Sequence, residues 1–303
     1  MDRNNPFITI ILPVYNGEKT LRETLESLLS QSYSNFELLI GIDGTKDNSK
    51  AIAESFNDDR IKIFENPENL GLGPNLNKLI SLSSGKSEFI AMAEQDDIYV
   101  NERLQWQIEV FNTNPDVGLV SGIVEFMNPN RSVLFPGILI DGQQFPRGKE
   151  LFEYLYVNQL KVVNTCMMFR KSIHEQHELK FTNRYPNMNI DWDYVLRFSL
   201  VSNVHGIPKK LASMNRGIAG TSVTRNKKLQ HETSRKLLKD FKREFPELVS
   251  NSLYKKALKM HRKIELGHRS KLGIIGYSIM YFLLYFDAYF LKYMYFRTKK
   301  YFE

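Results

Sequence analysis

The sequence has 303 residues, of which 42% are hydrophobic and 25% are charged, a balance typical of a globular protein with one substantial core. The formal net charge of +7 is unevenly distributed: residues 225–303 contain 19 Lys/Arg and 7 Asp/Glu (balance +12), whereas residues 1–224 contain 22 and 27 (balance −5). Basic residues confined to one segment argue against a nucleic-acid-binding protein, which usually carries them on a folded face. The single cysteine, Cys166, excludes an internal disulfide, and we find no secretory signal, so we expect a cytoplasmic location.

The first part of the chain alternates between strand-like and helix-like patterns. An apolar run at residues 8–12 predicts a buried strand that ends at Pro13. Thr20 and Glu23 predict a capping box that starts a helix, with leucines at positions 21, 25, 28 and 29 along its buried side. Similar patterns predict strands at 36–42, 60–65, 89–92 and 117–124, and helices at 49–57, after the glycine-rich turn 69–74, and around 104–111.

Strands that alternate with helices at this spacing predict an α/β fold with a largely parallel sheet. In such sheets, ligands bind outside the carboxyl ends of the strands. Asn16, Asp43, Asn69 and the pair Asp96-Asp97 each follow a predicted strand. We therefore expect these polar side chains to meet in one crevice.

The pattern weakens between residues 130 and 160, where Pro136, Gly137 and Gly142 predict a long loop that leads to a helix near 150–157. A helix at 191–201 and a strand at 204–211 follow. Beyond residue 225 the sequence is helical, basic and then aromatic. We therefore divide the chain into an α/β domain, residues 1–224, and a helical C-terminal region, residues 225–303.

The pair Asp96-Asp97 has two interpretations. Carboxylate oxygens are the ligands that Mg²⁺ and Mn²⁺ prefer, and a bound cation removes the repulsion between adjacent carboxylates. An isolated Asp-Asp pair, however, is more often an exposed acidic turn. The pair alone does not decide between the two.

Four blocks of the sequence, in the same order, resemble those of family 2 glycosyltransferases, which have the GT-A fold. The first runs from residue 8 to residue 49 and contains Pro13-Val-Tyr-Asn16, and the second is NLGLGPNLN at 69–77. The third is EQDD at 94–97 and the fourth is DWDYVLRFSL at 191–200. Three positions depart from the family pattern: Ile42 and Glu94 replace aspartates, and Arg216-Gly-Ile218 lacks a histidine.

The resemblance implies an inverting transfer of a sugar from a nucleotide-sugar donor, which we expect to be a UDP-sugar, to a hydroxyl of a lipid-linked glycan in bacterial surface polysaccharide biosynthesis. It also implies roles for individual residues. Asp191 would be the general base, and Asp97 would hold Mn²⁺ or Mg²⁺ on the diphosphate. The donor would be bound by Pro13, Val14, Tyr15, Asn16, Asp43, Asn69, Asn77 and Asp96, with Asp43 at the base and Asp96 near the ribose.

Two of these roles have structural alternatives. A carboxylate at Asp43 accepts the imide N–H of uracil, but Asp-Gly is also a common turn dipeptide. A carboxylate at Asp191 that takes the proton of an acceptor hydroxyl is worth roughly 10²–10⁴ in rate. Asp191 could instead be the N-cap of its helix. Arg216 is a further candidate for a phosphate contact.

The apolar segment 272–291 has three interpretations. It is close to the roughly 20 apolar residues that a membrane span needs. Tyrosines at 277, 281, 285, 289 and 293, with basic flanks, favour instead a helix lying on the inner leaflet, which would place the protein at the cytoplasmic face of the membrane. The third possibility is a helix packed on the catalytic domain.

Two other functions would each require a different sequence feature. A sugar nucleotidyltransferase needs a basic loop around a triphosphate, and 69–77 has only Lys78 nearby. A non-catalytic nucleotide-sugar-binding scaffold would lack the metal carboxylate or the base, and both are present. The six histidines show no zinc-site spacing, and we expect Cys166, Trp106 and Trp192 to lie in the core.

Overall fold

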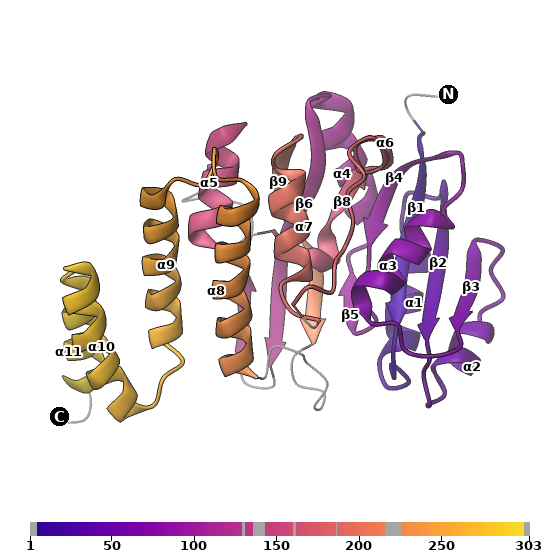
Figure 1. The fold of residues 1–303 in the computed structure, drawn as a ribbon. Coiled ribbons are helices and arrows are strands. Elements are labelled where there is room, and N and C mark those ends of the chain that lie inside the picture. Colours follow the sequence, from indigo (N-terminus) through magenta and orange to yellow (C-terminus); the bar gives the residue numbers. More distant parts are fainter. Residues whose placement is uncertain are drawn as a thin grey trace. The chain divides into compact units, whose positions relative to one another are not determined.

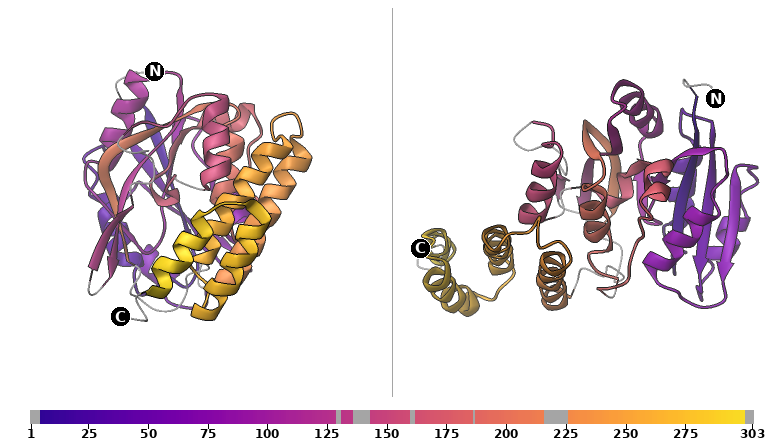
Figure 2. Two further views of the ribbon diagram at one scale, coloured as in Figure 1. Left: turned by 90° about the vertical axis from the view of Figure 1, so that its left-hand side faces the viewer. Right: turned by 45° about the horizontal axis from the view of Figure 1, so that its top comes forward.

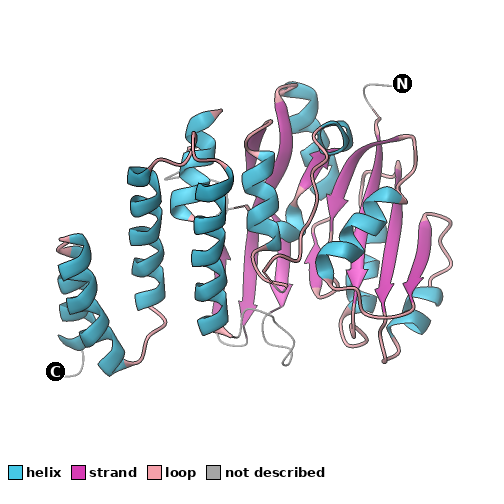
Figure 3. Cartoon of the chain, in the orientation of Figure 1, coloured by secondary structure: helices cyan, strands magenta, loops and turns pink. Residues whose placement is uncertain are grey.

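The computed structural model describes residues 5–128, 131–135, 143–159, 162–185, 187–215 and 226–299. The chain divides into two compact units, one of Met1–Phe152 with Leu160–Thr221 and one of Glu153–Gln159 with Ser222–Glu303. The first unit contains a sheet with helices, and the described part of the second contains helices alone (Figures 1 and 3). Helix α5 (Lys149–Asn158) begins in the first unit and ends in the second, so a division at one residue does not separate them.

The described residues of the first unit form one sheet of nine strands, in the order β3-β2-β1-β4-β8-β6-β9-β5, with β7 paired to β6. The neighbours β3, β2, β1 and β4 are parallel, as are β6 and β9, whereas β8 runs antiparallel between β4 and β6. The strands are β1 (Phe7–Val14), β2 (Phe36–Asp43), β3 (Ile61–Asn66), β4 (Ser87–Met92), β5 (Asp97–Tyr99), β6 (Val117–Asn128), β7 (Arg131–Phe135), β8 (Met168–Arg170) and β9 (Asn203–Asn215).

Helices cover both faces of this sheet (Figure 2). On one face, α1 (Leu21–Leu29), α2 (Ser49–Glu54) and α4 (Arg103–Thr113) share a core with alternate residues of the strands, such as Ile40 and Ile42. On the other face lie α3 (Leu72–Ser81), α6 (Lys171–Gln176) and α7 (Ile190–Phe198). Gly41 points to α3, where a Cβ would lie 2.5 Å from Asn75 Oδ1, so only glycine allows α3 to pack this closely. The predicted fold, a mostly parallel sheet flanked by helices, is confirmed.

The structure corrects three local predictions. Strand β1 continues through Pro13 to Val14, because the side of β1 that faces β4 has no pairing beyond Ile11, so the missing N–H is not needed. Thr20 does precede α1, but its side chain makes no capping bond, and its Oγ1 donates to the Gly17 carbonyl at 3.4 Å instead. Strand β7 lies inside the predicted long loop, where the exposed side chains of Val133 and Leu134 leave no alternating pattern.

The second unit contains α8 (Lys227–Glu244), α9 (Asn251–Leu266), α10 (Lys271–Tyr285) and α11 (Tyr289–Lys299). Leu266, Tyr281 and Phe290 form a small buried cluster. The apolar segment 272–291 is not one helix, because α10 ends at Tyr285, Phe286 follows in a left-handed conformation (φ 49°), and α11 lies beside α10 (Figure 2). Among the described residues, none of the helices has both the length and the apolar character needed to cross a membrane.

Candidate active site

The loops that follow β1 and β2 are joined by a network around Asp47, which the sequence interpretation missed. Asn16 adopts a left-handed conformation (φ 52°), and its amide N–H donates to Thr45 Oγ1 at 2.9 Å. The Thr45 and Ser49 hydroxyls both reach Asp47 Oδ1, at 2.7 and 2.5 Å. Burial raises the pKa of Asp47, but the bonds from Ser49, the Glu18 amide and Thr45 outweigh it and leave the pKa at about 2. The network therefore holds an ionised carboxylate that fixes the Asn16 loop.

A second connection joins the β1 loop to the acidic loop after β4. The Tyr15 amide donates to Gln95 Oε1 at 2.8 Å, and Gln95 Nε2 donates to the Tyr15 carbonyl at 3.0 Å. Gly17 lies against the same amide, where a Cβ would approach Gln95 Oε1 to 2.7 Å. The Tyr15 side chain remains 46% exposed, whereas Val14 is buried and Pro13 is half-buried. Of the predicted loop residues, Tyr15 and Asn16 thus offer side chains to a ligand.

Asp43 lies at the end of β2 and is 3% exposed. Its carboxylate accepts bonds from Asn66 Nδ2 at 2.8 Å, the Leu70 amide at 2.9 Å and the Gly71 amide at 3.0 Å. Since a carboxylate has about four acceptor positions, one remains for a ligand. Gly44 follows with φ 63°, so the Asp-Gly turn that was the structural alternative is also present. Asp43 therefore anchors the loop of Asn69 to the sheet, and its contact with a base stays a prediction.

The start of α3 is bonded to the segment that leads to Asp191. Both ends of the Asn77 side-chain amide form hydrogen bonds with the backbone of Phe181, at 2.7 and 3.0 Å. The Gly73 amide donates to Asn183 Oδ1 at 3.3 Å, and the Leu72 amide donates to Asn187 Oδ1 at 3.4 Å. These bonds favour a structural role for Asn77 over the predicted donor contact. They also bring the loop of Asp43 and the loop of Asp191 together.

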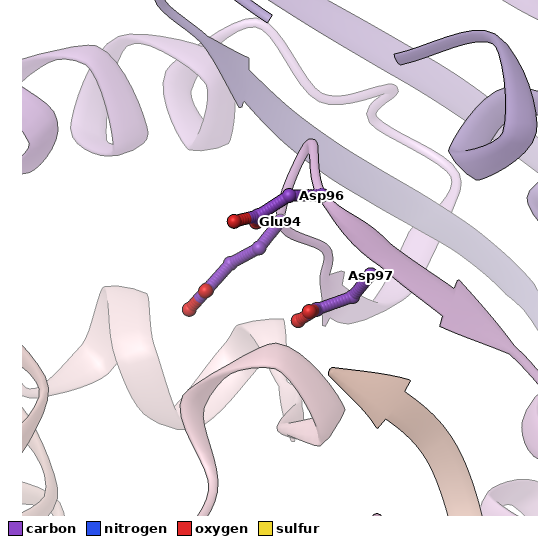
Figure 4. Close-up of side chains that lie close together, drawn as sticks. All are labelled: Glu94, Asp96 and Asp97. Atoms are coloured by element: carbon purple, nitrogen blue, oxygen red, sulfur yellow. The ribbon is translucent and has the colours of Figure 1, made fainter. Parts of the chain in front are cut away.

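Three carboxylates lie together between β4 and β5. The oxygens of Glu94, Asp96 and Asp97 lie within 4.8 Å of one another, and the side chains point into the same space (Figure 4). Glu94 and Asp96 are half-buried, and Asp97, the first residue of β5, is 1% exposed. The pair Asp96-Asp97 is therefore not an exposed acidic turn.

The protonation of this cluster reflects its burial. Burial raises the pKa of Asp97 to about 9, the charges of Glu94 and Asp96 add to this, and Thr165 and Arg103 oppose it. Burial also raises the pKa of Asp96. Asp97 Oδ2 is buried and has no hydrogen-bond partner among the described residues. Like charges held this close, with a buried acceptor left open, fit a hard divalent cation.

The cluster is held by buried residues that the sequence interpretation did not single out. Arg103 is fully buried, donates to the Met92 carbonyl at 2.6 Å and lies 4.5 Å from the centre of the Tyr99 ring. The Tyr99 hydroxyl lies 2.5 Å from Thr165 Oγ1, and Asn164 Nδ2 donates to Glu94 Oε1 at 2.7 Å. The only signal in the sequence was their proximity to the EQDD block or to Cys166.

Asp191 is in the first turn of α7, but it is not the N-cap. Asn189 precedes the helix in a left-handed conformation (φ 53°), and Asp191 is its second residue. Its Oδ1 accepts from the Trp192 amide at 2.9 Å. The Asp191 side chain is half-buried, and desolvation raises its pKa. The N-cap alternative is wrong, and a carboxylate with a raised pKa suits a base.

Other predictions are resolved more simply. Cys166 and Trp192 are buried, as predicted. Trp106 is half-buried, with Lys209 Nζ 4.1 Å from the centre of its ring. Arg216 lies outside the described residues.

Curated proteins with similar sequences are glycosyltransferases. An uncharacterized glycosyltransferase of Rickettsia typhi is 29% identical over 208 residues, 66% of this chain and 61% of the relative. The chain thus spans about three fifths of that relative. The Escherichia coli UDP-Glc:alpha-D-GlcNAc-diphosphoundecaprenol beta-1,3-glucosyltransferase WfgD is 34% identical over 126 residues, 42% of this chain and 49% of the relative.

Solved structures share the fold. Staphylococcus aureus TarS 1–349 in complex with UDP-GlcNAc matches with a TM-score of 0.62 and 17% identity, over 84% of this chain and 72% of TarS. The Pyrobaculum calidifontis mannosyltransferase PcManGT, in complex with GDP-Man and Mn²⁺, matches with a TM-score of 0.55 and 13% identity, over 95% of this chain and 82% of PcManGT. The family model described as Glycosyl transferase family 2 matches residues 9–178, more than half of the chain. The chain therefore belongs to the family 2 glycosyltransferases and has their GT-A fold.

Proposed function

We propose that this protein transfers a sugar, with inversion, from a UDP-sugar to a hydroxyl of a lipid-linked glycan in bacterial surface polysaccharide biosynthesis. The observation that carries the proposal is the cluster of Glu94, Asp96 and Asp97 beside the Tyr15 loop, in a chain of family 2. The WfgD relative, by its name, uses UDP-Glc and a diphosphoundecaprenol acceptor, and TarS was solved with UDP-GlcNAc. These names support a uridine nucleotide and a lipid-linked acceptor.

The loops of Tyr15, Asp43 and Asn69 would hold the nucleotide. The exposed Tyr15 ring offers a flat apolar surface, and Asn69 lies in the loop that Asp43 anchors. The one acceptor position left on Asp43 is suited to the imide N–H of uracil. Asp96, half-buried at the tip of its loop, would lie near the ribose.

Asp97 would hold Mn²⁺ or Mg²⁺, with Glu94 and Asp96 beside it. PcManGT, which was solved with Mn²⁺, shares the fold. A divalent cation bound here supplies Lewis-acid stabilisation of the charge that develops on the departing diphosphate. Because Asp97 has a raised pKa, it must lose its proton before it serves as a ligand.

Asp191 would remove the proton from the acceptor hydroxyl as the oxygen attacks the anomeric carbon. Its raised pKa brings it closer to neutral pH than an ordinary carboxyl, and this strengthens it as a base. Asp193, two residues further along α7, is instead fully buried and paired with Arg197 Nε at 3.1 Å. The pairing leaves Asp191 as the carboxylate of this turn that is available for chemistry.

We place the protein at the cytoplasmic face of the membrane, bound peripherally to the inner leaflet. The support is the apolar surface of α10 and α11, where Leu272, Phe286 and Phe296 are 83%, 83% and 75% exposed. Apolar side chains this exposed, flanked by basic residues, are typical of helices that lie in a membrane interface.

The test is the release of nucleoside diphosphate from a panel of UDP- and GDP-sugars, with a lipid-linked acceptor and Mn²⁺. We expect release from a UDP-sugar, and its loss in Asp97→Asn and Asp191→Asn. Asp59→Asn is the matched control, because Asp59 is exposed and lies outside the site. Transfer that persists in Asp191→Asn at the wild-type rate would remove the proposed mechanism.

A further inference from the structure

The second unit contains a cavity of about 450 Å³ between α8, α9 and α10. Of the described residues that line it, five are cationic and two are acidic, so it has a formal excess of three positive charges. The cationic residues are Lys227, Lys228, Arg235, Arg262 and Arg269. The volume lies in the range of roughly 300–1,000 Å³ that is usual for small-molecule sites.

One carboxylate accepts hydrogen bonds from three of these cationic side chains. Glu265 is 3% exposed, and its two oxygens accept from Arg235 Nη1 at 3.0 Å, Arg262 Nη1 at 2.6 Å and Arg269 Nη2 at 2.6 Å. The rings of Tyr277 and Tyr281 lie under Arg269 and Arg262, 4.0 and 5.4 Å from the guanidinium carbons. The guanidinium groups are thus held in place, but a single carboxylate does not neutralise them.

The cluster also has more donors than acceptors. The Nε–H groups of Arg262 and Arg269 are buried and have no hydrogen-bond partner among the described residues. His231 and His268 share one hydrogen bond, 3.0 Å between Nε2 and Nδ1. A network that served only to join the helices would balance its charges and satisfy its buried donors. This arrangement does neither, and its excess positive charge and open donors suit an anion.

The donors indicate which kind of anion would fit. Arginine guanidinium groups present forked N–H donors that match the oxygens of phosphate, and lysines add charge. Met280, on the wall of the cavity, is 46% exposed and lies next to an apolar stripe of α10. The stripe consists of Leu272, Ile275, Ile279 and Leu283, all exposed and spaced three or four residues apart. A phosphate site that opens beside an apolar stripe suits an amphiphile.

We propose that this cavity binds the phosphate of an anionic lipid headgroup, with the acyl chains against the α10 stripe. The inference deepens the proposed membrane attachment and does not depend on the transfer reaction. It replaces a diffuse attraction to basic residues with a defined headgroup site.

The first test measures binding of the full chain to vesicles of phosphatidylglycerol and phosphatidylcholine. Two double variants remove charge from the cavity: Arg262→Gln/Arg269→Gln, and Lys227→Gln/Lys228→Gln, whose lysines are exposed and tolerate change. The matched control is Lys255→Gln/Lys256→Gln, an exposed pair on α9 outside the cavity lining. We expect each cavity pair to weaken binding at least tenfold more than the control pair does. Equal losses in all three would overturn the defined site.

The second test uses inorganic pyrophosphate as a soluble probe. Millimolar pyrophosphate should raise the melting temperature of the wild type and of the control pair, but not of Arg262→Gln/Arg269→Gln. No shift in the wild type contradicts an anion site. If pyrophosphate shifts the melting temperature but vesicle binding is unchanged in both cavity double variants, then a free phosphate compound, and not a lipid, is the ligand.

Activity separates this inference from the proposed function. Release of UDP without vesicles should be unchanged in the cavity variants. Asp97→Asn should lose that release and still bind phosphatidylglycerol vesicles like the wild type. A cavity variant that loses UDP release in solution contradicts an exclusive role in headgroup binding.

Discussion

Gln95 is bonded at both ends of its side-chain amide to the backbone of Tyr15, whose N–H donates to Oε1 at 2.8 Å and whose carbonyl accepts from Nε2 at 3.0 Å. Two loops 80 residues apart in the sequence are thus joined directly. Gln95 stands between Glu94 and Asp96, so the position of the Tyr15 loop depends on the acidic loop. A change in the position of either loop therefore alters the position of the other.

Replacing Gln95 with alanine should weaken donor binding more than it slows catalysis. The variant loses two hydrogen bonds, worth about 0.5–1.5 kcal/mol each, so we expect KM for the donor to rise by roughly tenfold while kcat changes little. Initial rates over a range of UDP-sugar concentrations measure this. Gln176→Ala, at an exposed position on α6, is the control. An unchanged KM in Gln95→Ala would show that the Tyr15 loop holds its place without this bond.

Asp97→Asn should abolish the response to metal and relieve repulsion. We expect a loss of activity on the order of 10²-fold or more, because the charge of the departing diphosphate is no longer stabilised. Without metal, the variant should melt at a higher temperature than the wild type, since the neutral amide removes a buried carboxylate whose pKa is raised to about 9.

Differential scanning fluorimetry with and without Mn²⁺ checks this, again with Asp59→Asn as the control. The wild type and the control should gain stability from Mn²⁺, and Asp97→Asn should not. A Mn²⁺-induced shift of normal size in Asp97→Asn would locate the metal elsewhere.

The local elements were predictable from sequence where one pattern dominated. The predicted leucines at positions 21, 25, 28 and 29 all lie in α1, and the buried run of β2 was placed to within one residue. Strand β7 was missed because Val133 and Leu134 are adjacent and both exposed, so the segment lacks the alternation of a half-buried strand, although it pairs with the neighbouring strand β6. The capping box failed because a turn through Gly17 already precedes α1.

The sequence alone could name candidate residues for the site, but not the contacts that hold them in place. Asp97 stood out through its neighbour and its block, whereas Asp47 and Arg103 carry no pattern of their own, and their contacts with the Glu18 amide and the Met92 carbonyl arise only in the folded chain. Asn77 was predicted from its place in the block at 69–77, and nothing in the sequence indicated that its side-chain amide is bonded to the backbone of Phe181. The charged cavity escaped notice because Glu265 meets Arg235 only after α8 and α9 pack.

The rate of transfer should fall at mildly acidic pH because of Asp191. Desolvation raises its pKa above the ordinary value of 3.8, and only the ionised form accepts a proton. We therefore expect kcat, at saturating donor and Mn²⁺, to fall with pH through a pKa above that of an ordinary aspartate. Asp191→Asn should have a kcat lower by roughly 10²–10⁴ and no such acid limb. An acid limb at the same pH in this variant would assign it to another group.

The second unit should lose stability in acid through two buried histidines. Burial lowers the pKa of His261 to about 3 and that of His231 to about 4. Arg235 lowers both pKa values further, and Glu265 opposes the shift. Arg262 also lowers the pKa of His261, and His268 and Lys227 also lower that of His231. Above the unfolded-state pKa of about 6.5, both states are neutral and the full stability is present. Below this unfolded-state pKa, the unfolded chain binds protons at these two histidines and the folded unit does not. The free energy of unfolding therefore falls from pH 6.5 down to about pH 3.

Urea titrations of the full chain at pH 7 and pH 5, followed by circular dichroism, measure the effect. His261→Gln and His231→Gln should each show a smaller loss of stability between these values than the wild type. His177→Gln, at an exposed position of the first unit, should lose as much as the wild type. Since a glutamine at 261 does not titrate, a variant that keeps the full acid sensitivity would show that His261 is already protonated in the folded unit.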